Sequence, residues 1–161
     1  MPTISISQRI EAPPEQIWSF ISDLRRGSEY VTVMKELLYV SDEPIKQGTV
    51  YRELSKIGPG MSETKWVITT LEAPDLQVHR CREPTLQATL TVRIEPNGRG
   101  SKILHQTEFQ VLPVFRPLGW LLEKVFVHRL MNAEMRETVQ NLKRIIESTN
   151  EQIGEDTASY S

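Results

Sequence analysis

The chain has 161 residues, of which 39% are hydrophobic and 25% are charged. This length and composition fit one globular domain and exclude a disordered or fibrous protein. With 19 Lys and Arg against 21 Asp and Glu, the formal net charge is -2, so no strong positive field would attract nucleic acid. The single cysteine, Cys81, cannot form an internal disulfide and is most simply a buried apolar residue.

The N-terminal region predicts a strand followed by a helix. Residues 4–11 begin with alternating isoleucine and serine, the pattern of a half-buried strand. Pro13-Pro14-Glu15 then predicts a helix start, because proline is favoured in the first turn and an acidic side chain there suits the helix dipole. The following apolar residues recur at helical spacing and form one stripe: Ile17, Phe20, Ile21 and Leu24.

The middle of the chain predicts six further strands. They cover residues 34–42, 49–57, 64–71, 76–83, 86–95 and 103–111. The connections between them are too short for parallel crossovers, so neighbouring strands are expected to be antiparallel. Asn97-Gly98 predicts a tight hairpin between the last two strands, because these residues tolerate positive φ angles.

The C-terminal region predicts one long helix over residues 118–147. Its second half has a clean apolar stripe, whereas its first half is apolar on more than one side. Residues 149–161 are polar or small, so we expect a single domain over residues 1–148 and a flexible tail over 149–161. We find neither a signal-like start nor an apolar run long enough to span a bilayer, and we therefore expect a cytoplasmic protein without stable membrane insertion.

This order of elements is similar to the helix-grip fold of the START-like (SRPBCC) superfamily, in its polyketide cyclase/dehydrase branch. The resemblance runs from Thr3 to about Ser148. The matching segments are 10–18, 22–24, 48–49, 72–74, 117–119 and 141–146, which read IEAPPEQIW, SDL, GT, EAP, PLG and NLKRII. The resemblance implies an α+β fold in which a curved antiparallel sheet of about seven strands wraps around the C-terminal helix, with a short helical segment after the first strand. It also implies a cavity between sheet and helix for an apolar or amphipathic ligand.

Physical reasoning leads to the same cavity, because a sheet with one apolar face needs the long apolar helix as a cover. We therefore expect a protein that carries or binds a hydrophobic or amphipathic small molecule, such as a lipid, an isoprenoid or a polyketide-like compound. An alternative is a cyclase- or aromatase-type enzyme that folds a reactive chain and moves protons. A second alternative is an interaction module whose apolar segment 114–127 docks on a protein or membrane. The sequence leaves the oligomeric state open.

Candidate catalytic residues are His105 and Arg52. His105 shares its predicted strand face with apolar residues and could act as a base, or it could be an interior histidine bonded to a hydroxyl such as that of Thr107. If Val50 and Leu54 face inward, so does Arg52, which could then bind an enolate or carboxylate of the ligand. Arg52 could instead lie on the convex face and pair with a glutamate, and the same choice is open for Arg80 and Arg82.

Further candidates would line the cavity. They are Trp66, Arg80, Leu90, Thr107, Phe109, Trp120, Leu121, Phe126, Met131 and Met135. The aromatic and methionine members of this set could equally be plain core. His79 and His128 are isolated, so we expect them at the surface or its boundary. The spacing of His and Cys residues predicts no metal site, and no motif predicts a cofactor.

Overall fold

The computed structural model describes residues 2–57, 60–84, 86–111 and 120–158. Seven strands and a long C-terminal helix make up most of the fold, as predicted. In chain order the elements are β1 (Thr3–Ile10), α1 (Pro14–Ile21), the 3₁₀ turn η1 (Leu24–Arg26), α2 (Gly27–Tyr30), β2 (Met34–Val40), β3 (Val50–Ile57), β4 (Gly60–Glu72), β5 (Leu76–Arg82), β6 (Leu86–Asn97), β7 (Gly100–Val111) and α3 (Trp120–Ala158).

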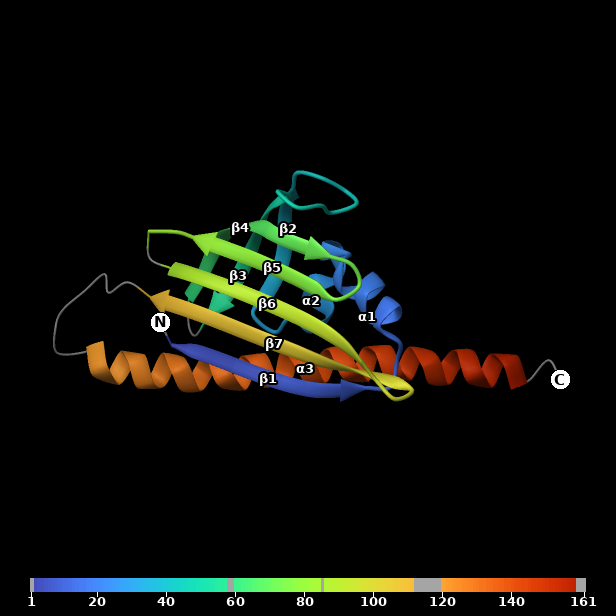
Figure 1. Cartoon of the computed structure of the whole chain (residues 1–161). Helices are drawn as coiled ribbons and strands as arrows, with labels where there is room; N and C mark the ends of the chain where they lie inside the picture. Colours follow the sequence, from blue (N-terminus) through green and yellow to red (C-terminus); the bar gives the residue numbers. More distant parts are fainter. Residues whose placement is uncertain (1, 58–59, 85, 112–119, 159–161) are drawn as a thin grey trace.

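The strands form one antiparallel sheet in the order β1-β7-β6-β5-β4-β3-β2 (Figure 1). Strands β2 to β7 are therefore arranged as a meander, and β1 completes the sheet beside β7. The β6–β7 hairpin is the one that Asn97-Gly98 predicts, and Gly98 has a φ of 65°. Proline begins α1, also as predicted.

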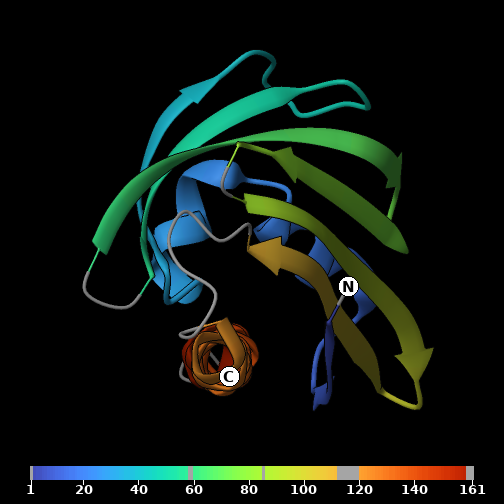
Figure 2. The same ribbon diagram turned by 90° about the vertical axis from the view of Figure 1, so that its left-hand side faces the viewer.

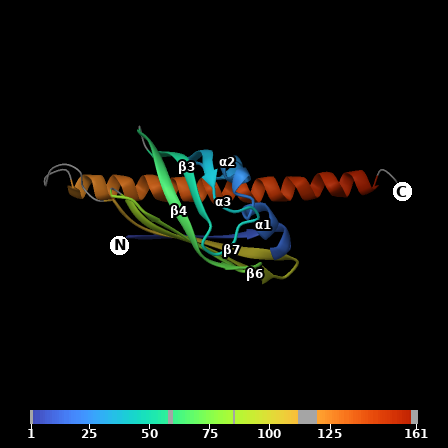
Figure 3. The same cartoon turned by 90° about the horizontal axis from the view of Figure 1, so that it is seen from above.

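The sheet is strongly curved, and its concave side faces α3. Figure 2 looks along α3 and shows the strands arching over it, while α1 and α2 close one end of the arch. Figure 3 shows α2 beside α3. The core between these layers is built from alternate residues of β1, β6 and β7 and from the stripes of α1 and α3. Its members with less than 3% exposure include Ile4, Ile10, Ile17, Ile94, Ile103, Val139, Leu142 and Ile146.

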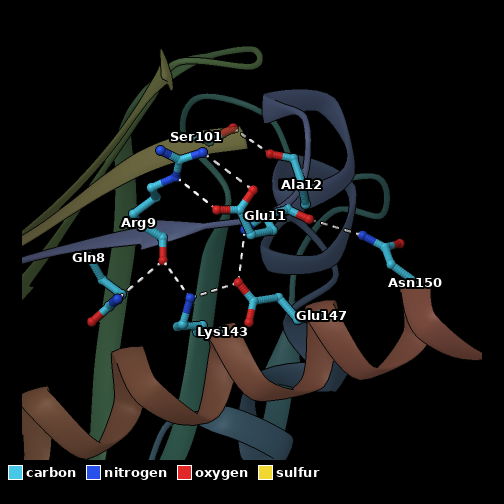
Figure 4. Close-up of polar contacts among 8 residues, drawn as sticks. All are labelled: Gln8, Arg9, Glu11, Ala12, Ser101, Lys143, Glu147 and Asn150. Atoms are coloured by element: carbon cyan, nitrogen blue, oxygen red, sulfur yellow. Dashed lines mark hydrogen bonds and ion pairs between the residues drawn. The ribbon is translucent and has the colours of Figure 1, made fainter. Parts of the chain in front are cut away.

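Polar contacts connect α3 to the end of β1 (Figure 4). Glu147 accepts a hydrogen bond from the backbone N–H of Glu11 at 2.9 Å, and its carboxylate also pairs with Lys143 at 2.7 Å. Lys143 in turn donates to the backbone oxygen of Arg9 at 3.0 Å. Asn150 donates to the backbone oxygen of Glu11 at 3.3 Å. These contacts hold the second half of the helix against the sheet.

Helix α3 is longer than the sequence predicts. It continues to Ala158, beyond the expected domain end at Ser148. Residues 149–158 contain several good helix formers and no proline, and the Thr149 hydroxyl donates to the backbone oxygen of Ile145 at 2.8 Å, so nothing in this segment ends the helix. Figures 1 and 3 show that this part of the helix projects past the sheet.

Candidate functional site

A pocket lies between the concave face of the sheet and α3, with a volume of about 140 Å³. Strands β3 to β7 supply one wall, and α3 supplies the opposite wall. The segment that follows α1 completes it. The lining residues are Ile21, Leu24, Tyr30, Val31, Val33, Glu53, Trp66, Gln77, His79, Leu90, Val92, Ile103, His105, Thr107, Met131, Glu134, Met135, Thr138 and Leu142.

Strand pairing explains which side chains reach the pocket. Side chains alternate between the two faces along each strand, and residues paired across strands share a face. His79 on β5 pairs with Leu90 on β6, which in turn pairs with Thr107 on β7. Val92 on β6 pairs with His105. Both histidines therefore lie on the concave face, two strands apart.

His79 is held by a chain of hydrogen bonds along the pocket wall. Its Nε2 lies 3.1 Å from Oε1 of Gln77, which can only accept, so His79 carries its proton on Nε2. Its Nδ1 then accepts from the Tyr51 hydroxyl at 2.9 Å. The Gln77 amide donates to the Ser22 hydroxyl at 3.1 Å. Burial lowers the pKa of His79 to about 4, so its imidazole is neutral at physiological pH.

His105, by contrast, makes no hydrogen bond with any residue in the described ranges. Its side chain is buried, with 9% of the residue exposed, and its Nδ1 is shielded and without a partner. The hydroxyl of Thr107, which the sequence suggested as a partner, does not bond to it. Burial lowers the pKa of His105 to about 4. An unpaired buried polar group destabilises a protein by about 1–3 kcal/mol, which makes this imidazole the exceptional group of the pocket.

Glu53 on β3 places a carboxyl group in the same pocket. The residue is 8% exposed, and its Oε1 accepts from the Ser55 hydroxyl at 2.8 Å and from the Thr64 hydroxyl at 3.5 Å. Burial raises the pKa of Glu53, and these hydrogen bonds offset part of the rise. Trp66 lies beside it, with its indole nitrogen donating to Thr64 at 3.2 Å and its ring stacked on Tyr51 at 6.4 Å. The pocket therefore has a carboxyl group on β3 and imidazoles on β5 and β7.

The three candidate arginines lie outside the pocket. Arg52 is exposed and pairs with Glu63 at 2.8 Å on the convex face, which is the second of the two orientations considered above. Tyr51 and Glu53, its neighbours on β3, point inward instead of Val50 and Leu54. Arg80 and Arg82 are likewise exposed. No arginine or lysine is among the described residues that line the pocket.

The other candidates divide into three groups. Five line the pocket as expected, namely Trp66, Leu90, Thr107, Met131 and Met135. Phe109 is buried in the adjacent core, where its ring contacts that of His128 at 6.5 Å, whereas Phe126 is 66% exposed. The side chains of Trp120 and Leu121, like most of the segment 114–127 considered for docking, lie outside the described residues. Cys81 is buried, as predicted.

Sequence reasoning missed several polar residues of the site, among them Tyr51, Glu53 and His79. Tyr51 and Glu53 were overlooked because only Arg52 was considered as a site residue on their strand. The expectation that His79 lies at the surface or its boundary is wrong, since only 4% of it is exposed. Residues 77–82 did contain a usable signal: Gln77, His79 and Cys81 share one face of the strand, and both arginines of this strand lie on the other.

A polar groove adjoins the pocket. It lies between α2, the start of β2 and α3, and it shares Tyr30, Val31 and Glu134 with the pocket. Thr32 ties this boundary to α3, because its backbone N–H donates to the Thr138 hydroxyl at 3.2 Å and its own hydroxyl donates to the backbone oxygen of Glu134 at 3.2 Å. The connection between α2 and β2 therefore forms part of the boundary between the pocket and this groove.

Within the described residues, no three His, Cys, Asp or Glu side chains converge as metal ligands. None of the described helices is both long and apolar enough to cross a membrane.

A family model described as "Polyketide cyclase / dehydrase and lipid transport" matches residues 1–147. The chain belongs to this family. Among curated relatives, "Toxin Rv0910" of Mycobacterium tuberculosis H37Rv is 24% identical over 142 residues, covering 88% of this chain and 95% of that protein. This match confirms the resemblance to the polyketide cyclase/dehydrase branch of the START-like superfamily that the sequence suggested.

Solved structures of similar proteins share the fold. TTHA0849 from Thermus thermophilus superposes with a TM-score of 0.77 at 19% identity, covering 92% of this chain and 99% of that one. The di-domain ARO/CYC protein StfQ from the steffimycin biosynthetic pathway gives a TM-score of 0.74 at 11% identity, covering 92% of this chain and 51% of that one. At these identities the likeness concerns the helix-grip fold alone.

Proposed function

We propose that this member of the polyketide cyclase/dehydrase and lipid transport family binds a hydrophobic or amphipathic small molecule between its sheet and α3, as a carrier or binding protein. The observation that carries the proposal is the pocket itself, whose exposed surface is largely apolar although polar side chains from β3, β5 and β7 are among its lining. Ligand sites generally combine a concave apolar surface with a small number of polar groups that fix orientation. Lipids, isoprenoids and polyketide-like molecules remain the ligand classes to test.

Blocking the pocket tests this proposal. Leu90 on β6 lines the pocket, and in Leu90→Trp the larger indole side chain would fill part of its space. The control is Leu104→Trp, the same change at a half-buried position on the convex face of β7. Native mass spectrometry of the purified protein would reveal a retained ligand, and NMR titration with toluene would measure the capacity for an apolar guest. We expect binding by the wild type and by Leu104→Trp and its loss in Leu90→Trp. Equal binding by all three would refute the proposal.

The unpartnered His105 favours a second candidate function, a cyclase-type enzyme in which this imidazole moves a proton. Two observations make binding the stronger proposal. An imidazole with a pKa of about 4 is a weak base at neutral pH. The described pocket also has no cation to stabilise an enolate. If His105→Ala loses turnover while its ligand affinity and thermal midpoint are unchanged, the enzymatic function is supported. If turnover, affinity and thermal midpoint all fall together, it is contradicted.

A further inference from the structure

Resting on the proposed ligand binding, we propose that the ligand is an uncharged molecule with a single ring that carries a hydroxyl group, and that the imidazole of His105 binds this hydroxyl. Three properties of the pocket lead to this class: its size, its one unpaired imidazole and the sign of its titratable groups.

The volume of the pocket matches a ligand of about one ring. Its volume is about 140 Å³. A protein cavity of about 150 Å³ is known to accommodate benzene. Drug-sized ligands occupy pockets of about 300–1,000 Å³, so this pocket matches a single ring better than a fused multi-ring compound or a long acyl chain. The indole of Trp66, oriented by its hydrogen bond to Thr64, supplies an aromatic surface at the pocket wall.

The two histidines of the pocket differ in what they leave available. Both nitrogens of His79 are occupied, one by Tyr51 and the other by Gln77. His105 has no partner among the described residues, although it is more than nine-tenths buried. A neutral imidazole offers one donor and one acceptor, and a hydroxyl can pair with either. His105 lines the pocket, so a hydroxylated guest in contact with its imidazole would supply the partner that the described residues do not.

The titratable groups of the pocket exclude an anion. The titratable residues of its lining are Glu53, Glu134, Tyr30, His79 and His105, and the described lining contains no lysine or arginine. A carboxylate or phosphate placed there would lose its water without gaining a counter-charge. An uncharged hydroxyl has a much smaller desolvation penalty and can recover it at His105.

Isothermal titration with four probes tests the inference: toluene, phenol, benzoate and laurate. Toluene and phenol have nearly the same size, so their affinity ratio isolates the hydroxyl group, whereas benzoate adds a charge and laurate adds a charged chain. The test variant is His105→Phe, which keeps a planar ring and removes the hydrogen bond. We expect the phenol-to-toluene affinity ratio to fall by about two- to tenfold in this variant, the equivalent of one neutral hydrogen bond. Benzoate and laurate should show no measurable binding.

A second measurement covers the case in which His105→Phe does not fold. In the wild-type protein, phenol should shift the ring ¹⁵N signals of His105 and leave those of His79 in place, whereas toluene should shift neither set. Tighter binding of benzoate or laurate than of phenol, or an unchanged affinity ratio in the variant, would overturn the inference and leave the proposed binding function standing. If none of the four probes binds and no ligand co-purifies, both fall.

Discussion

The hydroxyl of Tyr51 lies 2.9 Å from Nδ1 of His79, although the two residues are 28 positions apart in the chain. This bond joins β3 to β5 across β4, and the Tyr51 hydroxyl donates to Nδ1 because Gln77 holds the proton of His79 on Nε2. Gln77 and Ser22 extend the chain of hydrogen bonds to the end of α1. The same contacts that orient the pocket wall therefore also connect the sheet to the helical segment.

Removing the hydroxyl group tests this connection. In Tyr51→Phe the buried Nδ1 of His79 loses its donor, and we expect the free energy of unfolding to fall by about 1–3 kcal/mol. Urea denaturation at pH 7 would measure it. Tyr39→Phe removes a hydroxyl from a side chain that is 47% exposed and should change stability by less than about 0.5 kcal/mol. Equal effects of the two changes would contradict the role assigned to this bond.

The buried Glu53 predicts a pH dependence of stability. Because burial raises its pKa, the folded state holds the proton more tightly than the unfolded state. The contribution of Glu53 to the stability of the fold is therefore fully present below its unfolded-state pKa near 4.5, and it is lost as pH rises through its folded-state pKa. Glu53→Gln removes the charge with little change in shape, and we expect it to stabilise the protein at pH 7–8, by about 1.4 kcal/mol for each unit of pKa shift, and to have little effect near pH 4.

Denaturation midpoints at several pH values would measure this difference. Glu36→Gln, the same change at an exposed position on β2, provides the matched control. A stability gain in Glu53→Gln that is independent of pH would show that packing, and not charge, is responsible.

The histidines predict the opposite pH trend. Burial lowers the pKa of His105 to about 4, so the unfolded chain, with a value near 6.5, takes up its proton first as pH falls. The contribution of the neutral His105 to stability is therefore fully present above pH 6.5, and it is lost as pH falls from about 6.5 to 4. We expect the wild type to lose stability relative to His105→Phe over this range, by up to about 1.4 kcal/mol per pH unit. NMR titration of the His105 ring would check the folded pKa directly, and a value near 6.5 would contradict the prediction.

The bond between Thr32 and Thr138 is expected to hold the boundary between pocket and groove. Thr138→Val keeps the shape of the side chain but leaves the Thr32 amide without its acceptor. We expect a loss of about 1–2 kcal/mol and faster hydrogen exchange at the Thr32 amide. Thr138→Ser retains the hydroxyl and should protect this amide as the wild type does. Unchanged exchange in Thr138→Val would show that other contacts hold this connection.

The sequence predicts the fold better than it predicts the site. Strict alternation in β6 and β7 put Leu90, His105 and Thr107 on the concave face, and the structure agrees. For β3 the sequence leaves both orientations open, because Val50 and Leu54 form the more apolar set but share their face with Arg52. In the structure the concave face of β3 carries Tyr51, Glu53 and Ser55, all of them buried.

Hydrogen bonds account for the buried carboxyl group on β3. Glu53 is tolerated inside because Ser55 and Thr64 donate to it, and Thr64 belongs to the neighbouring strand. Hydropathy along one strand cannot reveal a partner that only sheet pairing supplies. The end of α3 was underestimated for a different reason, since polar composition was taken to indicate a tail although the residues there are compatible with a helix.

The projecting end of α3 is a site at which a label or tag can be attached without disturbing the core. Glu151, Gln152 and Ile153 are exposed, and they follow the residues that hold the helix to β1. A fluorophore, an affinity tag or a surface linker attached beyond this point would stand clear of the sheet. A label at this position leaves the pocket walls unmodified, which makes this end of the helix suited to immobilisation for ligand screening.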